Sequence, residues 1–503
     1  MVAGLMVAGL MAAGMTGCTG STEDAGEENV GPAVARGEPM TLDVLVFNIE
    51  YEGGQATDKV IERLDADVVG VLESYDRLPE IAAKTGYEFY NVGLQILSHY
   101  PIHEPSGAEG LYALIEVQPG YVVAMFNIHL DYVRYGPRLL ARGTPVAEVL
   151  DSEDEVRTSS LRFALPRMQD LAERGYPVVL TGDFNQPSSL DYSAKTVGTR
   201  PGVTEPIAWP VSEALFGIGF RDTYREVHPD PVEVPGITMA DPDFRKGGQG
   251  DRIDFVYAGG PSTTQDSRLV GEPGGADVDV PFRPWTSDHR AVLSTLELAP
   301  VALSTTVSLT SRMLTRGDPL GVYVNAPADG NALEVRTAAG EVLPKPGRSD
   351  LASAVALSLP TAELEPGGYD VVLLDAAGEE LAHNEFWLRS EVAGTTLSTD
   401  KRTYAVDEPI TVTWANGPAN RWDWIGVYRA GASDPDTDDY LVWGYTGGHD
   451  SGALPPTVSG SIELGEGSQG STWPLPPGEY VAHYLLADRY DSAGTTQFVV
   501  TPG

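Results

Sequence analysis

Residues 177–185 read PVVLTGDFN, an apolar run that ends in an acid and an amide. The run PVVLT (177–181) predicts a buried strand, because short continuous apolar runs are typical of strands covered on both faces. Asp183 and Asn185 follow at its end, and residues two apart in extended backbone point to the same side. Buried strands normally end in turn formers, so this ending predicts a functional site at the edge of a sheet.

The same pattern recurs along residues 41–298. Apolar runs predict further strands at 42–48, 67–72, 121–129, 253–257 and 291–298. Helical spacing predicts helices at 57–65 and 161–171, the second kinked or divided at Pro166. Alternating strands and helices over this length indicate an α/β domain with one large core. The polar residues at the ends of these further strands are Asn48, Glu50, Glu73, His129, Asp254, Asp288 and His289.

The residue types in this set suit a hard metal ion. Mg²⁺ prefers oxygen ligands and keeps several waters, so it needs only one or two protein carboxylates. Glu50, Glu73 and Asp288 offer carboxylates, and Asn48 offers a neutral oxygen. We therefore expect Mg²⁺ as the cofactor, with Mn²⁺ or Ca²⁺ as alternatives.

The remaining members suit phosphate chemistry. The Asp183 carboxylate could polarise an attacking water while the Asn185 amide donates to a phosphoryl oxygen. His289, oriented by a carboxylate such as Asp254, could donate to the phosphate as an imidazolium.

Seven motifs follow one another between Thr41 and Ala299: LDVLVFNIE, GVLES, QILSHYPI, FNIHLDY, LTGDFNQPSSLDY, DRIDFVY and WTSDHRAV. In this order they resemble the endonuclease/exonuclease/phosphatase superfamily, which includes deoxyribonuclease I-like and exonuclease III-like nucleases, inositol polyphosphate 5-phosphatases and bacterial sphingomyelinases. The resemblance covers near half the chain. It departs from the family at Leu72, which stands where many members have Gln before the motif glutamate.

The resemblance implies a four-layer α/β/β/α sandwich with the site in the crevice between its two sheets. It implies that Glu73 is the principal metal ligand, helped by Asn48, Glu50 and Asp288. It further implies that Asp183 activates the attacking water. Contacts to the phosphate or transition state would come from Asn185 and His129, and a carboxylate–histidine pair from Asp254 and His289. The implied reaction is metal-assisted, in-line attack of water on a phosphoester.

Residues 131–160 are predicted to form a long loop after His129. It contains four arginines in a strongly acidic chain, namely Arg134, Arg138, Arg142 and Arg157. We expect Arg134 or Arg157 to bind a substrate phosphate or carboxylate, since the guanidinium group matches both.

After Pro300 the sequence predicts β-structure in two units. Residues 314–324 parallel residues 404–414, and residues 366–371 parallel residues 477–482. Each unit has the size of a β-sandwich domain, which predicts two all-β immunoglobulin-like sandwich domains at 301–392 and 393–503 after an α/β catalytic domain at 41–300. The stretch NRWDWIGVY (420–428) resembles the signature of SKICH-type domains. We expect its tryptophans in the sandwich core, with an aromatic binding platform as the alternative. The acidic run 434–439 lacks the calcium-loop pattern and is expected to be a solvated loop.

The N-terminus predicts export. Residues 1–17 are apolar and small, too few to span a bilayer but typical of a secretion signal. MTGC (15–18) resembles a bacterial lipobox, so Cys18 is a candidate for lipidation, although no Lys or Arg precedes the apolar run. We expect a signal segment at 1–18, a flexible linker at 19–40, and a protein lipid-anchored to the cell membrane or secreted.

The chain carries 33 basic and 72 acidic residues, a formal charge of −39. This disfavours long polyanionic partners, which need a basic face. With a single cysteine, Cys18, the chain has neither an intrachain disulfide nor a cysteine-based zinc site. The composition and motifs together predict an exported phosphodiesterase or phosphatase acting on a small or medium phosphoester, with two alternatives. These are an extracellular nuclease and a surface binding protein with a vestigial catalytic domain. The β-sandwich domains are candidates for contacts with the cell surface or another protein.

Overall fold

The computed structural model describes residues 35–502, apart from 109, 133, 240–249, 346, 390–393, 420–422, 432–434, 436–439, 447–457, 467, 469, 471 and 487–488. The predicted signal segment with Cys18, residues 19–34 of the linker, Trp422 and most of the acidic run 434–439 lie outside this part. Residues 35–503 form one compact unit.

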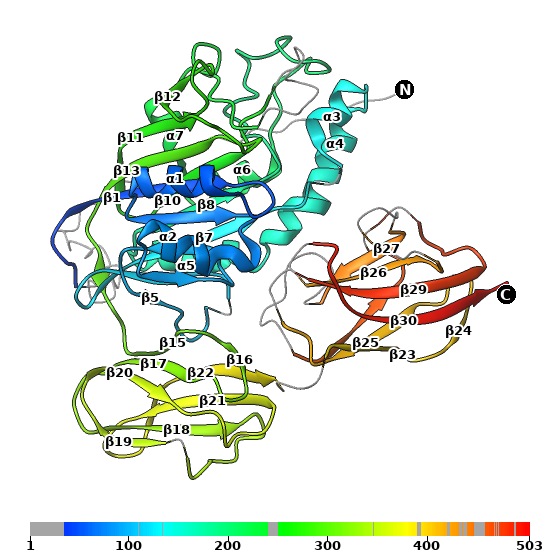
Figure 1. Cartoon of the computed structure of the whole chain (residues 1–503). Coiled ribbons are helices and arrows are strands. Elements are labelled where there is room, and N and C mark those ends of the chain that lie inside the picture. The colour runs from blue at the N-terminus through cyan, green and yellow to red at the C-terminus, as the bar shows by residue number, and fades with distance from the viewer. Residues whose placement is uncertain are drawn as a thin grey trace, which may run out of the picture. The chain divides into compact units, whose positions relative to one another are not determined.

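Two sheets form the α/β region (Figure 1). The first has the order β12 (Val278–Pro281), β11 (Ser262–Gly271), β13 (Ala291–Leu298), β1 (Met40–Asn48), β2 (Val68–Leu72), β4 (Ile96–Ser98) and β3 (Phe89–Asn91). The second has the order β5 (Ile102–His103), β6 (Ala113–Gln118), β7 (Tyr121–His129), β8 (Val178–Asp183), β10 (Asp254–Gly259) and β9 (Arg221–Asp222), and β14 (Val301–Ala302) pairs with β7. In each sheet two central strands run parallel, β1 with β2 and β7 with β8.

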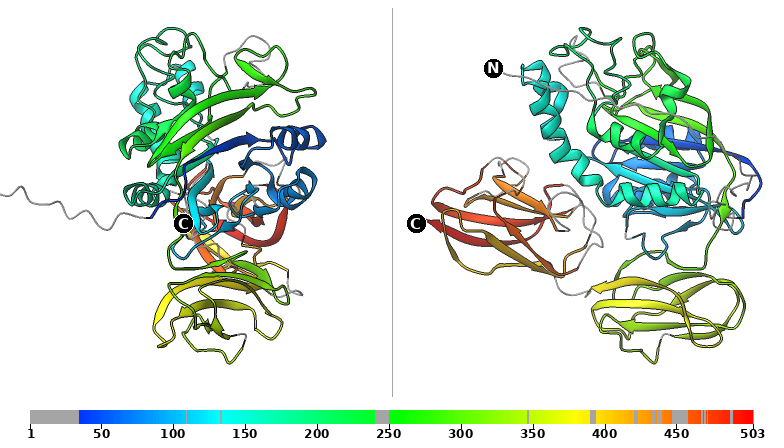
Figure 2. Two further views of the ribbon diagram at one scale, coloured as in Figure 1. Left: turned by 90° about the vertical axis from the view of Figure 1, so that its left-hand side faces the viewer. Right: turned by 180° about the vertical axis from the view of Figure 1, so that it is seen from behind.

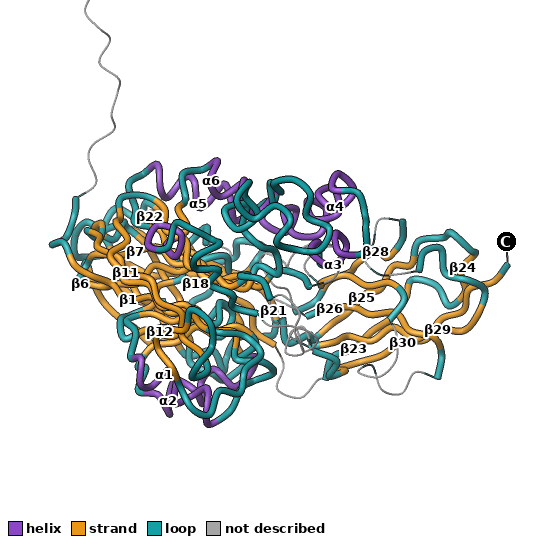
Figure 3. The backbone as a smooth tube through the Cα atoms, turned by 90° about the horizontal axis from the view of Figure 1, so that it is seen from above, coloured by secondary structure: helices purple, strands orange, loops and turns teal. Residues whose placement is uncertain are grey.

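The sheets pack face to face, and helices cover their outer faces. Val46 of β1, Met125 of β7 and Val256 of β10 belong to the core between the sheets. The second sheet packs outward against α5 (Ala164–Glu173) and α6 (Pro210–Gly217). The first packs outward against α1 (Gln55–Leu64) and α2 (Leu78–Thr85). Figure 3 shows the strands between these two pairs of helices, which confirms the predicted four-layer sandwich.

The predicted loop at 131–160 is helical, so that expectation was wrong. The segment forms α3 (Gly136–Ala141), α4 (Val146–Glu153), a π-helical turn (Asp154–Thr158) and a 3-10 turn (Ser159–Leu161). Leu140 and Val149 of this segment pack with Trp209 in a small apolar cluster. The buried Glu153 carboxylate also accepts hydrogen bonds from Gly136 N and Gln186 Nε2. The predicted helix at 161–171 is divided, as expected. The 3-10 turn ends at Leu161, and α5 begins at Ala164 with Pro166 in its first turn.

Two β-sandwiches follow, each with a three-stranded and a five-stranded sheet. The first contains β15 (Thr306–Leu309), β17 (Leu320–Asn325) and β20 (Ala354–Leu359) against β16 (Met313–Thr315), β22 (Glu380–Arg389), β21 (Gly367–Leu374), β18 (Asn331–Thr337) and β19 (Arg348–Leu351). The second contains β23 (Thr396–Thr399), β25 (Ile410–Ala415) and β28 (Gly460–Leu464) against β24 (Thr403–Ala405), β30 (Ser492–Thr501), β29 (Gly478–Leu485), β26 (Trp424–Arg429) and β27 (Val442–Tyr445).

The two sandwiches share one topology. Their short strands β16 and β24 pair in parallel with the last strand of each unit, and each core combines residues of both sheets. Figure 2 shows the two layers of the first sandwich from the side. The shared order agrees with the repeat seen in the sequence. Among the described residues, the helices are all too short or too polar to cross a bilayer.

Candidate active site

Strand register brings three of the predicted residues together in one sheet. The last residue of β7, His129, pairs with Asp183, the last residue of β8. Asp254, the first residue of the antiparallel strand β10, pairs with Asp183 from the other side. The Asp183 carboxylate is 1% exposed, and its Oδ2 lies 3.6 Å from His129 Nε2.

The first sheet brings Asn48, at the end of β1, and Glu73, directly after β2, to the same place. Asn48 is fully buried and its amide donates to both Glu73 Oε1 (3.0 Å) and Asp183 Oδ2 (3.1 Å). The other Glu73 oxygen accepts a hydrogen bond from Tyr51 N at 2.9 Å. One neutral amide thus links carboxylates from both sheets, which reduces the repulsion between them.

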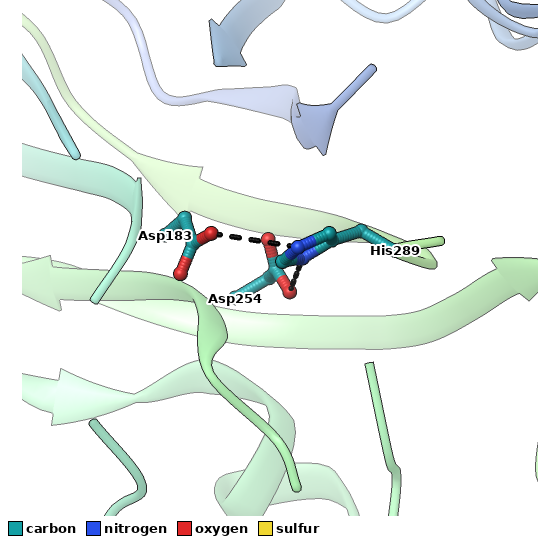
Figure 4. A group of neighbouring side chains, drawn as sticks. All are labelled: Asp183, Asp254 and His289. Atoms are coloured by element: carbon teal, nitrogen blue, oxygen red, sulfur yellow. Dashed lines mark hydrogen bonds and ion pairs between the residues drawn. The ribbon is translucent and has the colours of Figure 1, made fainter. Parts of the chain in front are cut away.

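His289 precedes β13 and completes the group (Figure 4). Its Nδ1 lies 2.9 Å from Asp254 Oδ2, and its Nε2 lies 3.7 Å from Asp183 Oδ2. Burial by itself would lower the pKa of His289, but the carboxylates of Asp254 and Asp183 raise that pKa well above its usual value. Burial raises the pKa of the Asp254 carboxyl, although the charge of His289 opposes this shift. The arrangement favours an imidazolium facing Asp183.

The other predicted residues adjoin this group. Glu50 Oε2 accepts a hydrogen bond from Asp288 N at 3.0 Å. The Asn185 amide donates to Leu130 O at 2.9 Å and lies 3.4 Å from His129 Nε2. Glu50, Glu73 and Asn185 have left-handed backbone, with φ of 56°, 60° and 45°. Such strain in residues other than glycine is typical of functional sites.

A cavity of about 680 Å³ opens onto this group. The predicted residues that line it are Glu73, His129, Asp183, Asn185, Asp288 and His289. Its volume lies in the range of about 300–1,000 Å³ that is usual for small-molecule sites.

The structure does not bring the two predicted substrate-binding arginines to this cavity. Arg157 is fully buried and paired with Glu153 at 2.8 Å, so its role is to hold the helical segment 136–158 together. Arg134 is 45% exposed and pairs with Glu155 at 2.9 Å. The cation of this segment that lines the cavity is Arg138. Sequence reasoning singled out the cluster of arginines, but it could not choose among them without the helical phase.

The donor set fits a hard divalent cation. Glu73 and Asp288 present carboxylates to the cavity, and Asn48 and Glu50 hold their neighbours in place. Asp183, Asp254 and His289 also have ligand atoms within 4.8 Å of one another. In this second group the His289 Nδ1 already bonds Asp254. Glu73 and Asp288 are the carboxylates outside this second group that both line the cavity and stand among the ligands predicted from the sequence.

Residues 45–289 match the model of the Endonuclease/Exonuclease/phosphatase family. An uncharacterized protein of Caenorhabditis elegans is 28% identical over 251 residues, which is 44% of this chain and 78% of that protein.

Solved structures similar to this chain include an endonuclease/exonuclease/phosphatase from Beutenbergia cavernae, with 18% identity, 69% of this chain and 100% of that chain covered, and a TM-score of 0.33. An AP endonuclease from Archaeoglobus fulgidus has 15% identity, coverage of 50% and 98%, and a TM-score of 0.35. A 3′-5′ exonuclease from Neisseria meningitidis has 18% identity, coverage of 50% and 98%, and a TM-score of 0.33.

Proposed function

Because residues 45–289 match the model of the Endonuclease/Exonuclease/phosphatase family, we propose that this chain is a divalent-metal-dependent hydrolase of small or medium phosphoesters. The observation that carries the proposal is the placement of the buried Asp183 carboxylate. It lies between the Nε2 atoms of His129 and His289 and is linked through Asn48 to Glu73. This combines a base, two imidazole rings and a carboxylate suited to a metal at one end of a cavity.

In the proposed mechanism, Asp183 accepts a proton from the attacking water. Asn48 and the backbone N–H of Asn185 hold its carboxylate in place, the latter at 2.9 Å. His289, oriented by Asp254, donates to a phosphoryl oxygen as an imidazolium, and His129 and Asn185 supply further contacts to the phosphate. Donors fixed in position before the reaction are the larger part of such catalysis, worth about 10²–10³ in rate each.

Glu73 and Asp288 would hold the metal ion, with Asn48 and Glu50 in support. When bound, Mg²⁺ supplies positive charge that stabilises a developing phosphoryl negative charge. Mn²⁺ and Ca²⁺ are alternatives with the same preference for oxygen ligands.

The volume of the cavity and the net charge of the chain support a small substrate. A cavity of about 680 Å³ suits a metabolite-sized ester, and a net charge of −39 opposes a long polyanion. We place the reaction outside the cytoplasm, because residues 1–18 resemble a lipoprotein signal. Incorporation of labelled palmitate in the native host, lost in Cys18→Ser, would support lipid anchoring. Absence of label in the wild type would contradict it.

The test of the activity uses chromogenic esters. Residues 19–503 are incubated with bis(p-nitrophenyl) phosphate and with p-nitrophenyl phosphate, each with Mg²⁺, with Mn²⁺ or with a chelator. We expect nitrophenolate release that needs the metal and disappears in Asp183→Asn. The matched control is Asp170→Asn, an exposed carboxylate on α5, which should leave the rate unchanged. Equal release by wild type and Asp183→Asn, or release unaffected by the chelator, would contradict the proposal.

A further inference from the structure

The wall of the active-site cavity comes from two parts of the chain. Besides the residues described above, it includes Trp424, Trp443 and Tyr445 of strands β26 and β27, together with Tyr440 and Tyr490. These five rings are here called the aromatic wall. All belong to the last β-sandwich, more than 130 residues beyond His289 in the sequence.

Specific contacts join this sandwich to the catalytic region. Arg489 forms an ion pair with Glu52, which follows β1, and its guanidinium lies 4.4 Å from the centre of the Tyr75 ring. The Tyr132 hydroxyl is hydrogen-bonded to Tyr440. An ion pair, a cation–π contact and a hydrogen bond therefore join the last β-sandwich, which carries the aromatic wall, to the catalytic region.

The rings differ in how much of their surface the protein covers. Trp424 and Trp443 are 5% and 6% exposed and pack edge to face with their centres 5.7 Å apart. Tyr440 and Tyr490 pack on Trp424 at 5.6 and 5.8 Å but are only half-buried. Trp424 also donates from its indole to Arg489 O at 3.0 Å. The tryptophans thus form a rigid base that presents the two tyrosines to the cavity.

We propose that the aromatic wall binds a flat, apolar ring on the organic part of the substrate, so that the last β-sandwich sets the specificity of the catalytic site. Aromatic faces bind planar rings by stacking, a contact that tolerates different ring types. The substrate class is then a small phosphoester that carries an aryl or heterocyclic group. This inference rests on the proposed function for the position of the phosphate, next to Asp183 and His289.

A quaternary ammonium group is the other ligand that aromatic rings favour. One observation counts against it here. Arg489 already stacks on the ring of Tyr75. A guanidinium group stacks on the planar ring of a ligand in the same way.

The test measures binding rather than turnover, so that it does not depend on catalysis. Calorimetric titrations of residues 19–503 with 1-naphthyl phosphate, methyl phosphate and phosphocholine are compared in the presence of Ca²⁺. Stacking of this kind predicts that 1-naphthyl phosphate binds about 10–100-fold more tightly than methyl phosphate. Tyr440→Leu and Tyr490→Leu should each reduce this preference by about 5-fold or more.

Two further variants separate ring binding from folding. Tyr440→Phe keeps the ring and should keep the preference, and Tyr90→Leu removes an exposed tyrosine of strand β3 outside the cavity. Equal affinity for the naphthyl and methyl esters, or a preference that survives both leucine variants, would overturn the inference. Tightest binding of phosphocholine would assign the wall to a cation instead. Ring-selective binding without hydrolysis of any ester would leave the inference standing and defeat the proposed function.

Discussion

Replacing Asp254 by Asn should slow catalysis in a way that depends on pH. Asp254 is fully buried and its Oδ2 lies 2.9 Å from His289 Nδ1. Asn has nearly the same shape and can still accept a hydrogen bond, so the variant removes chiefly one negative charge. At a charge separation of about 4 Å and an effective dielectric constant of about 20, that charge stabilises an imidazolium by about 4 kcal/mol.

The direction of the pH effect follows from the pKa of His289. In the wild type that pKa lies well above its usual value, because Asp254 and Asp183 outweigh the effect of burial, and this favours the imidazolium form of His289. Without the Asp254 charge the pKa of His289 falls, and the imidazolium is lost as the pH rises through the lower value. A lost charged donor costs about 10²–10³ in kcat, so the deficit should be largest at pH 8 and smaller at pH 6.

The assay is the steady-state hydrolysis of bis(p-nitrophenyl) phosphate between pH 6 and pH 8.5, with the wild type, Asp254→Asn and the exposed control Asp170→Asn. Circular dichroism checks that each variant is folded. A wild-type kcat in Asp254→Asn would refute the assignment of His289 as an oriented donor. A deficit that is the same at every pH would refute the electrostatic reasoning.

Two other substitutions test the metal site and the support beneath the site. Glu73→Gln should raise the Mg²⁺ or Mn²⁺ concentration needed for half-maximal activity. Loss of a residue that merely supports a metal ligand typically weakens metal binding ~10–100-fold, and loss of a ligand should cost at least as much. An unchanged metal dependence would exclude Glu73 as a ligand. Arg252→Met should reduce stability by about 3–5 kcal/mol, because Arg252 is 1% exposed and pairs with Asp222 at 2.6 Å and Asp191 at 2.8 Å. In this variant Asp191 keeps its ion pair with Arg225 at 2.6 Å, whereas Asp222 loses the guanidinium of Arg252. Adding Asp222→Asn removes that unpaired charge and should restore part of the lost thermal midpoint. An unshifted midpoint in Arg252→Met would show that the network contributes nothing to stability.

The members of the candidate site could be predicted from the sequence because they stand at strand ends. Parallel pairing of β7 with β8 and antiparallel pairing of β10 with β8 place His129, Asp183 and Asp254 side by side. The apolar runs predicted those strands, and polar residues at their ends marked the site. The strand register then brings these residues, which are distant in the sequence, into one cluster.

Two features could not be read from the sequence. The helical segment after His129 packs Leu140 and Val149 against Trp209 and also contains the buried pair Glu153–Arg157. Its helices α3 and α4 have only six and eight residues, which is too short for a clear apolar periodicity in the sequence. The aromatic residues of the last sandwich were expected to serve its core, and Trp424 is indeed almost fully buried. Trp424 also lines the cavity. Its place there follows from contacts such as Arg489–Glu52, which join segments more than 400 residues apart in the sequence.

The most direct test of the central claim is to run the hydrolysis of a phosphoester in water enriched in oxygen-18 and to find the label by mass spectrometry. Attack of water on phosphorus, assisted by Asp183, predicts one labelled oxygen per turnover in the phosphate-bearing product and none in the released alcohol or phenol. Label in the alcohol or phenol would show that water attacks carbon and would contradict the account.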